Sequence, residues 1–413
     1  MDGDSRVEQF DTTVRQLTEK YLAMWRNIPD VMPEFSRRFT PWQQRENERQ
    51  LEIHFKRYPI SFAADGDVQD PGNSPISFDV IKTVVGSSLL SHEGLNDKYF
   101  DESEKTTRRF MKEAMIFDPS LSEGDIHQAL RNLWVFNSIQ MIVGKEIKFT
   151  PSSFAYSLLY PYTDNGLDSS AHTSEEKQEY IRWLNQWLRG NKYGPMDIWT
   201  GKTAELLVII ENEYPPQKFS DVHLSLSAIH RAQSKSLLLH NIQPGCDEES
   251  LAAITIEKGG TSVLADGYLA AGRLNNAEAD SFFEYGVLLQ LVDDLRDIDE
   301  DRVNSHSTPF SRIAAQDNLD SAARRLLSFV KHCAMQLSSL NHSHAHQVKE
   351  MVEQSCSFLI LETAARLREF YSTRFLKSVE RWMPLRPAFL NELHREIEMR
   401  QTQSAKYSRA THA

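Results

Sequence analysis

Residues 282–302 read FFEYGVLLQLVDDLRDIDEDR and are the most informative stretch of this 413-residue chain. The stretch is apolar in its first half and then abruptly acidic, and it predicts a single helix. On that helix Asp293, Asp297 and Asp301 are spaced i, i+4, i+8 and project from one face. Like charges at this spacing destabilise an isolated helix, and carboxylate oxygens are the ligands that Mg²⁺ prefers. The run from Asp293 and Asp294 to Asp297, a D-D-x-x-D, therefore predicts a cation site, with a solvated acidic helix end as the alternative.

A second acidic motif follows another aromatic stretch, FAYSLLYPYTDNGLD, at residues 154–168. Asp164, Asn165 and Asp168 form D-N-x-x-D, which on its own is also a common turn sequence. Two such motifs, each ending an aromatic helix, are what a two-sided metal clamp on a diphosphate requires. We therefore expect facing helices to bring both sets of carboxylates to one mouth.

The remainder of the chain also has the pattern of helices. In residues 7–25 apolar side chains recur every three or four positions, and alternating strand patterns are nearly absent from the sequence. The sequence thus predicts an all-α fold. The Gly-, Pro- and Asp-rich stretch at 63–75 is the best candidate boundary, so we expect an N-terminal helical extension at 1–75, a main domain at 76–400 and a disordered tail at 401–413.

Composition restricts the class of function. The chain has 46 basic and 58 acidic side chains, for a net charge of −12, which argues against non-specific nucleic-acid binding. No apolar run approaches the roughly 18 residues of a transmembrane helix, so we expect no integral membrane association. The N-terminus lacks a signal-peptide pattern and the three cysteines lack C-x-x-C spacing, so we expect a cytoplasmic protein with reduced thiols.

The two acidic motifs resemble those of the class I isoprenoid synthases. Residues 290–301, QLVDDLRDIDED, are similar to the Q-x-x-N-x-x-R-D-x-x-E-D of squalene and phytoene synthases and to the F-Q-x-x-D-D-x-x-D of trans-prenyl diphosphate synthases. Residues 156–168 resemble the phytoene-type Y-x-x-C-x-x-x-D-D-x-x-D, with Asn165 in place of the second Asp. Asp293 replaces the phytoene-type Asn, and the segment after Arg302 lacks R-G-R-x-Y-L-P. These departures favour a terpene synthase over a head-to-head coupling enzyme.

The resemblance implies a bundle of long antiparallel helices around a central active-site cavity. It also implies three Mg²⁺ ions, which clamp and ionise an allylic prenyl diphosphate. The implied catalytic acids are Asp164, Asp168, Asp293 and Asp297. The implied metal ligands are Asp164, Asn165, Asp168, Asp293, Asp294, Asp297 and Asp301. A prenyltransferase that joins two prenyl units, and a non-catalytic helical protein that binds cations or a partner, remain as alternatives. A homodimer is compatible with each of them.

Basic side chains near the motifs are candidates for contacting the diphosphate. They are Arg231, Lys235, Lys258 and Arg302. The first two lie one turn apart on a helix predicted over 221–241, where a solvated basic pair is the alternative. The third precedes Gly259 and Gly260, which allow close backbone approach, although a helix break at the glycines is the stronger expectation.

Aromatic side chains near the motifs are candidates for lining the cavity. They are Trp134, Phe136, Phe154, Tyr156, Tyr160 and Tyr268. An aromatic ring stabilises a desolvated cation by about 2 kcal/mol, which suits a carbocation intermediate. Most aromatic residues at helical spacing belong to the ordinary core, so we expect a minority of these six to line the cavity.

Overall fold

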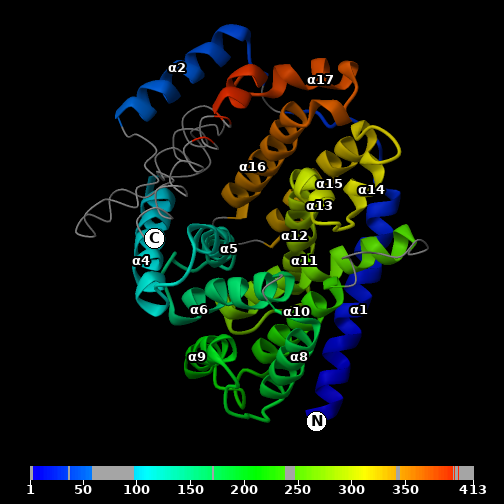
Figure 1. Ribbon diagram of the computed structural model, residues 1–413. Coiled ribbons are helices and arrows are strands. Elements are labelled where there is room, and N and C mark those ends of the chain that lie inside the picture. Colours follow the sequence, from blue (N-terminus) through cyan, green and yellow to red (C-terminus); the bar gives the residue numbers. More distant parts are fainter. Residues whose placement is uncertain are drawn as a thin grey trace.

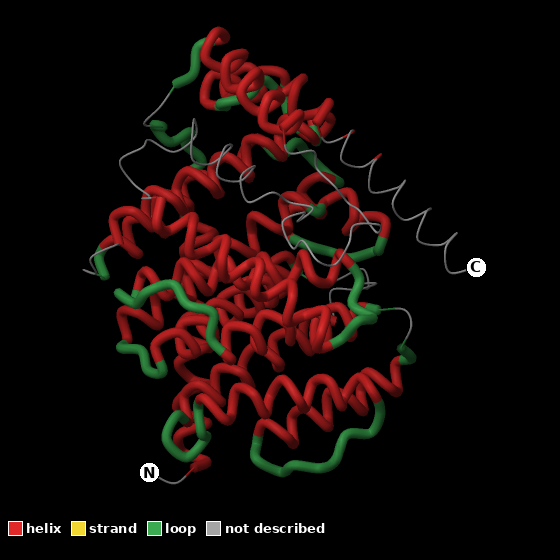
Figure 2. Tube along the Cα trace, turned by 90° about the vertical axis from the view of Figure 1, so that its left-hand side faces the viewer, coloured by secondary structure: helices red, strands yellow, loops and turns green. Residues whose placement is uncertain are grey.

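The structure is a computed structural model that describes residues 3–35, 38–57, 97–169, 172–237, 247–340 and 345–393, together with 395 and 399. Throughout these ranges the chain forms helices and loops and contains no β-strand (Figures 1 and 2). The all-α prediction is therefore confirmed. No helix in the described ranges combines the length and the apolar composition needed to cross a bilayer.

The N-terminal half contains α1 (Gly3–Asn27), α2 (Pro41–Arg57), α4 (Asp97–Phe117), α5 (Glu123–Ile142), α6 (Pro151–Tyr160), the π-helix η2 (Pro161–Asn165), α7 (Gly166–Asp168), α8 (Ser174–Leu188) and α9 (Ile198–Glu213). The C-terminal half contains α10 (Ser220–Ser236), α11 (Glu248–Ala271), α12 (Asn276–Arg296), α13 (Ile298–Val303), α14 (Pro309–Ala314), α15 (Asp320–Ser338), α16 (Ala345–Arg366) and α17 (Thr373–Val379). Short 3₁₀ segments follow at Arg368–Phe370 and Glu380–Trp382.

Capping side chains set the starts of many of these helices. Capping boxes begin five of the longer ones, at Ser122, Thr150, Thr173, Asp197 and Asn275. In each, the N-cap side chain accepts a backbone N–H that the helix itself leaves unpaired. Polar stretches of the sequence separate helices: α4 ends just before DPSLSEGD at 118–125, and α9 ends at the first residue of EYPPQKFSD at 213–221.

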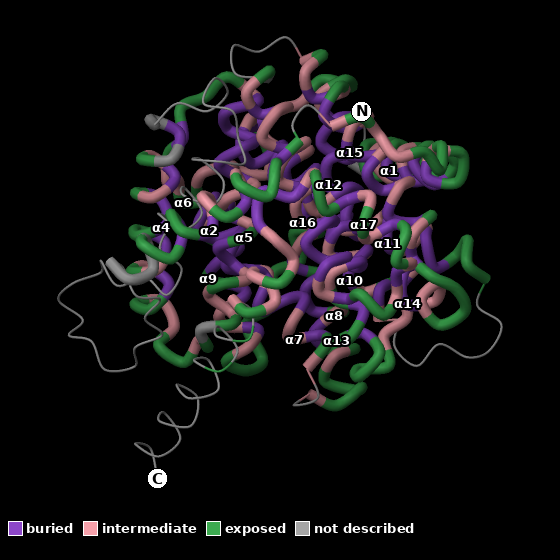
Figure 3. Tube along the Cα trace, turned by 90° about the horizontal axis from the view of Figure 1, so that it is seen from above, coloured by how far each residue is buried: buried purple, intermediate pink, exposed green. Residues whose placement is uncertain are grey.

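Helix α11 lies at the centre of the fold and packs against α12, α10, α1 and α5 (Figure 1). On the far side of α12, the pair α15 and α16 completes the packing. Figure 3 shows buried residues concentrated along the middle of the molecule. The apolar half of α12 explains this arrangement, because Phe282, Phe283, Leu288 and Leu291 are all fully buried there.

Helices α11 and α12 approach each other closely through glycines. A Cβ atom on Gly286 would lie 2.1 Å from the carbonyl oxygen of Gly259, and one on Gly260 would lie 2.3 Å from the Phe283 ring. The expected helix break at Gly259 and Gly260 is therefore wrong: α11 continues from Glu248 to Ala271. The glycines are needed for the crossing, because any side chain there would force the two backbones apart.

The described part of the N-terminal extension packs directly on the rest of the chain. Tyr21 of α1 is fully buried, and its hydroxyl lies 3.1 Å from Asp280 and 3.3 Å from Glu284 on α12. In α2, the Gln44 amide donates to the carbonyl oxygens of Glu380 and Met383, both at 2.9 Å. The predicted boundary at 63–75 and the predicted tail at 401–413 lie outside the described residues.

Candidate active site

The acidic stretch after α12 is divided between two helices. Helix α12 ends at Arg296, Asp297 is its C-cap with φ −95° and ψ 12°, and α13 follows. The prediction of one continuous helix over 282–302 is therefore wrong. A contact distant in sequence accounts for the end: the Arg366 guanidinium donates to the Arg296 carbonyl oxygen at 2.6 Å and satisfies a terminal acceptor. Repulsion between the successive carboxylates also disfavours continuation.

After this break, Asp301 lies in α13 and its side chain contacts the segment that leads to α14. Its buried carboxylate accepts a hydrogen bond from the Thr308 hydroxyl at 3.1 Å and lies 3.6 Å from Nδ1 of His306. The backbone N–H of His306 also donates to the Asp301 carbonyl oxygen at 2.8 Å. Asp301 thus joins α13 to α14, and the structure gives it a different environment from Asp293 and Asp297.

The three remaining acids of this motif crowd the end of α12. Asp294 is buried and accepts from Nε2 of Gln290 at 2.8 Å, but its Oδ2 has no hydrogen-bond partner among the described residues. Burial first, and then the charges of Asp301 and Asp293, raise the pKa of Asp294 to about 8. Asp297 reaches solvent, yet partial desolvation and the charge of Asp293 raise its pKa to about 6. A cation at this end of α12 would reduce the electrostatic repulsion between these carboxylates.

The first motif begins in a π-helix, and a proline explains why. Pro161 lacks the N–H that would continue the i→i−4 ladder, so the chain widens into η2. The N–H of Gly166 then bonds the carbonyl oxygen of Pro161, five residues back. Trp199 of α9 supports this segment, because its Nε1 donates to the Tyr162 carbonyl oxygen at 2.5 Å. The D-N-x-x-D sequence therefore forms a helical turn that carries Asp164 inward, with 8% of the residue exposed.

Asp164 forms a buried ion pair with Lys258 of α11. Nζ of the lysine lies 2.8 Å from Oδ1 and 3.1 Å from Oδ2 of the aspartate. Burial alone would lower the pKa of Lys258, but the adjacent carboxylate raises it above its usual range, so the ammonium stays charged. One sequence-predicted diphosphate contact thus lies directly beside the first acidic motif.

The two motifs approach the same tyrosine. The Tyr160 hydroxyl bonds Asp164, and its pKa is raised first by burial and then by the charges of Asp164 and Asp293. The positive charge of Arg131 on α5 works in the opposite direction and lowers the pKa of this hydroxyl. Nη1 of Arg131 lies 3.5 Å from Oδ1 of Asp293. We call Arg131, Tyr160, Asp164, Lys258 and Asp293 the charged cluster. It joins α5, α6, η2, α11 and α12.

The acids at the end of α12 fit a cation that shares its coordination with a ligand. Within the described ranges, no three His, Cys, Asp or Glu side chains come together closely enough to hold an ion by themselves. Mg²⁺ characteristically takes one or two carboxylates and completes its shell with phosphate oxygens and water. The acids Asp293 and Asp297, with the unpartnered Oδ2 of Asp294, form such an incomplete set.

Three other basic candidates have their own environments. Arg231 pairs with Asp11 of α1, and Lys235 pairs with Glu257 of α11 at 2.6 Å. Arg302 is exposed on α13. Both paired residues bond acids outside the two motifs, so their contact with a diphosphate stays a prediction.

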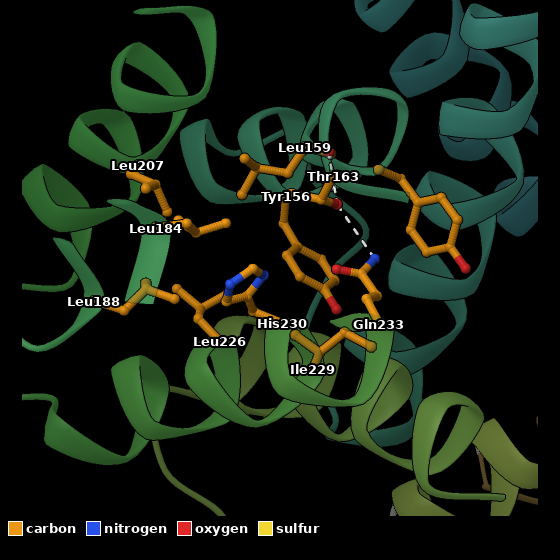
Figure 4. A pocket seen from close by; sticks show the side chains of 11 residues that line it. Tyr156, Leu159, Thr163, Leu184, Leu188, Leu207, Leu226, Ile229, His230 and Gln233 are labelled. Carbon is orange, nitrogen blue, oxygen red and sulfur yellow. Dashed lines mark hydrogen bonds between the residues drawn. The ribbon is translucent and has the colours of Figure 1, made fainter. Parts of the chain in front are cut away.

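A small pocket, with a volume of about 30 Å³, lies between α6, η2, α8, α9 and α10 (Figure 4). It is lined by Tyr156, Leu159, Tyr160, Thr163, Leu184, Leu188, Leu207, Leu226, Ile229, His230 and Gln233. Its wall adjoins the charged cluster, because Tyr160 belongs to both and Thr163 immediately precedes Asp164. The lining is mainly aliphatic, but this volume is far below the roughly 300–1,000 Å³ of ligand pockets, so an apolar chain would enter only if the surrounding helices moved apart.

Two of the predicted cavity aromatics, Tyr156 and Tyr160, line this pocket. The other four pack in or against the hydrophobic core: Trp134, Phe136, Phe154 and Tyr268. Phe154, for example, lies with its ring centroid 5.6 Å from that of Phe110. Their spacing in the sequence does not distinguish the two groups, since both occupy buried helix faces.

No protein-family model matches the sequence, and no curated protein matches it significantly. The function is therefore inferred from the charged cluster, the acids at the end of α12 and the adjoining pocket.

Proposed function

We propose that this protein is a Mg²⁺-dependent class I isoprenoid synthase, and within that class a terpene synthase that ionises one allylic prenyl diphosphate. The observation that carries the proposal is the charged cluster, where acids from both motifs approach one tyrosine beside a buried lysine. In this proposal the helices around the cluster and the pocket form the isoprenoid synthase bundle. The product is a terpene hydrocarbon or alcohol, together with diphosphate.

Lys258 is the residue proposed to receive the diphosphate. Its ammonium is buried, charged and held in place by Asp164. In such a low-dielectric position a fixed positive charge stabilises a phosphate oxygen far more strongly than it would in water. Arg131 supplies a second positive charge at the edge of the cluster, where it is 43% exposed and reachable from solvent.

The acids are proposed to hold Mg²⁺. Asp293, Asp294 and Asp297 would ligate it from α12, and Asp164, Asn165 and Asp168 from the first motif. Mg²⁺ held by these residues would supply positive charge to the diphosphate as the C–O bond breaks. Asn165 is oriented for this by its amide nitrogen, which donates to Asp125 at 3.0 Å. An amide oxygen carries no charge, so the first motif holds metal less tightly than three carboxylates would.

The small pocket between α6 and α10 is proposed to widen on substrate binding and receive the hydrocarbon chain. Its aliphatic lining keeps water away from the allylic cation, which water would otherwise quench. Tyr156 and Tyr160 line this pocket, and an aromatic ring can stabilise positive charge. The shared wall at Tyr160 would place the scissile bond between the charged cluster and the pocket.

The test is incubation of the protein with C10 to C25 prenyl diphosphates and Mg²⁺, followed by gas chromatography–mass spectrometry of the extract. A terpene formed from a single allylic substrate supports the proposal. A product that requires a second prenyl diphosphate, allylic or isopentenyl, would instead identify a prenyltransferase. Absence of any Mg²⁺-dependent product would contradict both enzymes and favour a helical protein that binds cations without catalysis.

A further inference from the structure

His230 is a basic side chain in an otherwise mainly aliphatic pocket wall. It lies on α10 between Leu226 and Gln233, and only 2% of the residue is exposed (Figure 4). The proposed binding of metal and diphosphate makes no use of it. A buried imidazole without full hydrogen bonding is costly, so its position calls for a ligand or a chemical role.

The two ring nitrogens of His230 have different environments. Nε2 lies 3.4 Å from the carbonyl oxygen of Ile181, an acceptor that favours the proton on Nε2. Nδ1 is buried and has no hydrogen-bond partner among the described residues. Burial lowers the pKa of His230 to about 4, so the ring is neutral at pH 7. This tautomer leaves a basic lone pair on Nδ1.

The other polar side chains of the pocket are poor bases. Tyr156 donates its hydroxyl proton to the carbonyl oxygen of Ser262 at 2.8 Å, and the Tyr160 hydroxyl donates to the Asp164 carboxylate. Thr163 donates to the carbonyl oxygen of Leu159 at 3.0 Å, and Gln233 donates to the Thr163 hydroxyl at 3.2 Å. Hydroxyl and amide groups do not accept a proton at neutral pH, whereas a neutral imidazole does.

We propose that His230 is the base that ends the reaction, by accepting a proton from the terpenyl cation at Nδ1. The inference rests on the proposed function. In this step a C–H bond adjacent to the cationic carbon breaks, and its electron pair forms the new C=C bond. The proton passes to Nδ1 and gives an imidazolium ion. Release of the product and diphosphate then lets the imidazolium return its proton to solvent, so charge and atoms balance.

The test compares His230→Phe, which keeps a ring but has no lone pair, with His230→Gln. The matched control is His223→Gln, because His223 lies on the same helix but bonds the Tyr214 carbonyl oxygen at 2.7 Å outside the pocket lining. Diphosphate release and the ratio of olefin to alcohol are measured for each protein. Acid–base catalysis is typically worth 10²–10⁴-fold, so both His230 variants should lose at least about tenfold in olefin share while they retain diphosphate release.

An unchanged olefin share in both His230 variants, with diphosphate release retained, overturns this inference alone. An unsubstituted protein that makes only alcohols overturns it as well. An unsubstituted protein that releases no diphosphate contradicts the proposed function, and the inference falls with it.

A second measurement does not depend on the variants folding or on turnover. The ¹⁵N NMR spectrum of histidine-labelled protein is recorded at pH 7 with Mg²⁺, before and after addition of a C15 prenyl thiolodiphosphate, an unreactive substrate analogue. The expected result is a neutral His230 ring protonated at Nε2, with an Nδ1 resonance that shifts when the probe binds. A protonated ring, or an Nδ1 resonance that the bound probe leaves unmoved, would overturn the assignment.

Discussion

Substitution of Gly286 by alanine tests the helix crossing that positions Lys258 beside the acids of α12. In a helix interior, Gly→Ala normally stabilises a protein by about 1 kcal/mol, because alanine loses less backbone entropy. Here the added Cβ would lie 2.1 Å from the Gly259 carbonyl oxygen and 3.1 Å from Cα of Gly260. Both contacts are backbone atoms of α11, so relief requires the two helices to separate.

Overpacking of this kind costs about 1–3 kcal/mol, and occasionally more where backbone must shift. Because the contact is with backbone atoms, we take the upper part of this range, about 2–3 kcal/mol; after subtraction of the propensity gain of about 1 kcal/mol, the net expectation for Gly286→Ala is a loss of stability of about 1–2 kcal/mol. The matched control is Gly201→Ala in α9, where the nearest atom to a new Cβ is Cβ of Pro195 at 3.9 Å. This control should be as stable as the unsubstituted protein or slightly more stable.

The assay is chemical denaturation followed by far-UV circular dichroism, with all three proteins compared at one protein concentration. The unfolding midpoint of Gly286→Ala should fall below that of the unsubstituted protein, and that of Gly201→Ala should not. A Gly286→Ala variant as stable as the Gly201→Ala control would refute the close crossing of α11 and α12. The position of Lys258 relative to the α12 acids would then need revision.

Three further predictions follow from the ion pairs and the acids. Lys258→Met should cost about 3 kcal/mol of unfolding free energy, because it leaves the Asp164 carboxylate buried without its cation, and adding Asp164→Asn should recover part of the loss in denaturation experiments; no recovery would argue against the pair. His332 should give a pH-dependent contribution to stability, since its hydrogen bond to the buried Glu284 carboxylate on α12 raises the His332 pKa. The contribution is fully present below the ordinary histidine pKa of about 6.5 and is lost as pH rises through the higher folded-state value, so His332→Gln should flatten the stability profile above about pH 6.5; an unchanged profile would contradict this. Asp168→Asn should raise the Mg²⁺ concentration needed for half-maximal turnover less than Asp297→Asn does, because the uncharged Asn165 already weakens the first motif; the opposite order would make the first motif the principal metal site.

Local pattern was sufficient to predict the all-α fold and, in two segments, a helix with its apolar part. The spacing of apolar residues in 7–25 corresponds to α1, and the apolar half of 282–302 corresponds to the buried part of α12. Lys258 could be proposed as a diphosphate contact because Gly259 and Gly260 follow it, although these glycines have a different role in the fold. Its two following glycines allow helices to cross, and they neither break α11 nor form a phosphate loop.

Features that depend on distant contacts could not be predicted. Helix α12 ends where the guanidinium of Arg366, 70 residues away, donates to the Arg296 carbonyl oxygen, and the local sequence does not indicate this contact. Arg131 reaches Asp293 from another helix and carries no motif. In the segment 221–241 the sequence predicts phosphate contacts for Arg231 and Lys235. Only the packing shows that His230, next to Arg231, is the buried basic side chain. The π-helix at Pro161 is an exception, because a proline inside an apolar helix is a readable signal.

The most direct test of the central claim is Mg²⁺-dependent release of diphosphate from allylic prenyl diphosphates. The rate is measured with Mg²⁺ and with excess chelator, for the unsubstituted protein and for Asp293→Ala and Asp297→Ala. We predict release by the unsubstituted protein with Mg²⁺ alone, and loss of release in both variants with an unchanged far-UV circular dichroism spectrum, because each removes a proposed metal ligand at the end of α12. Release that survives the chelator, or near-normal release by either variant, would contradict the account.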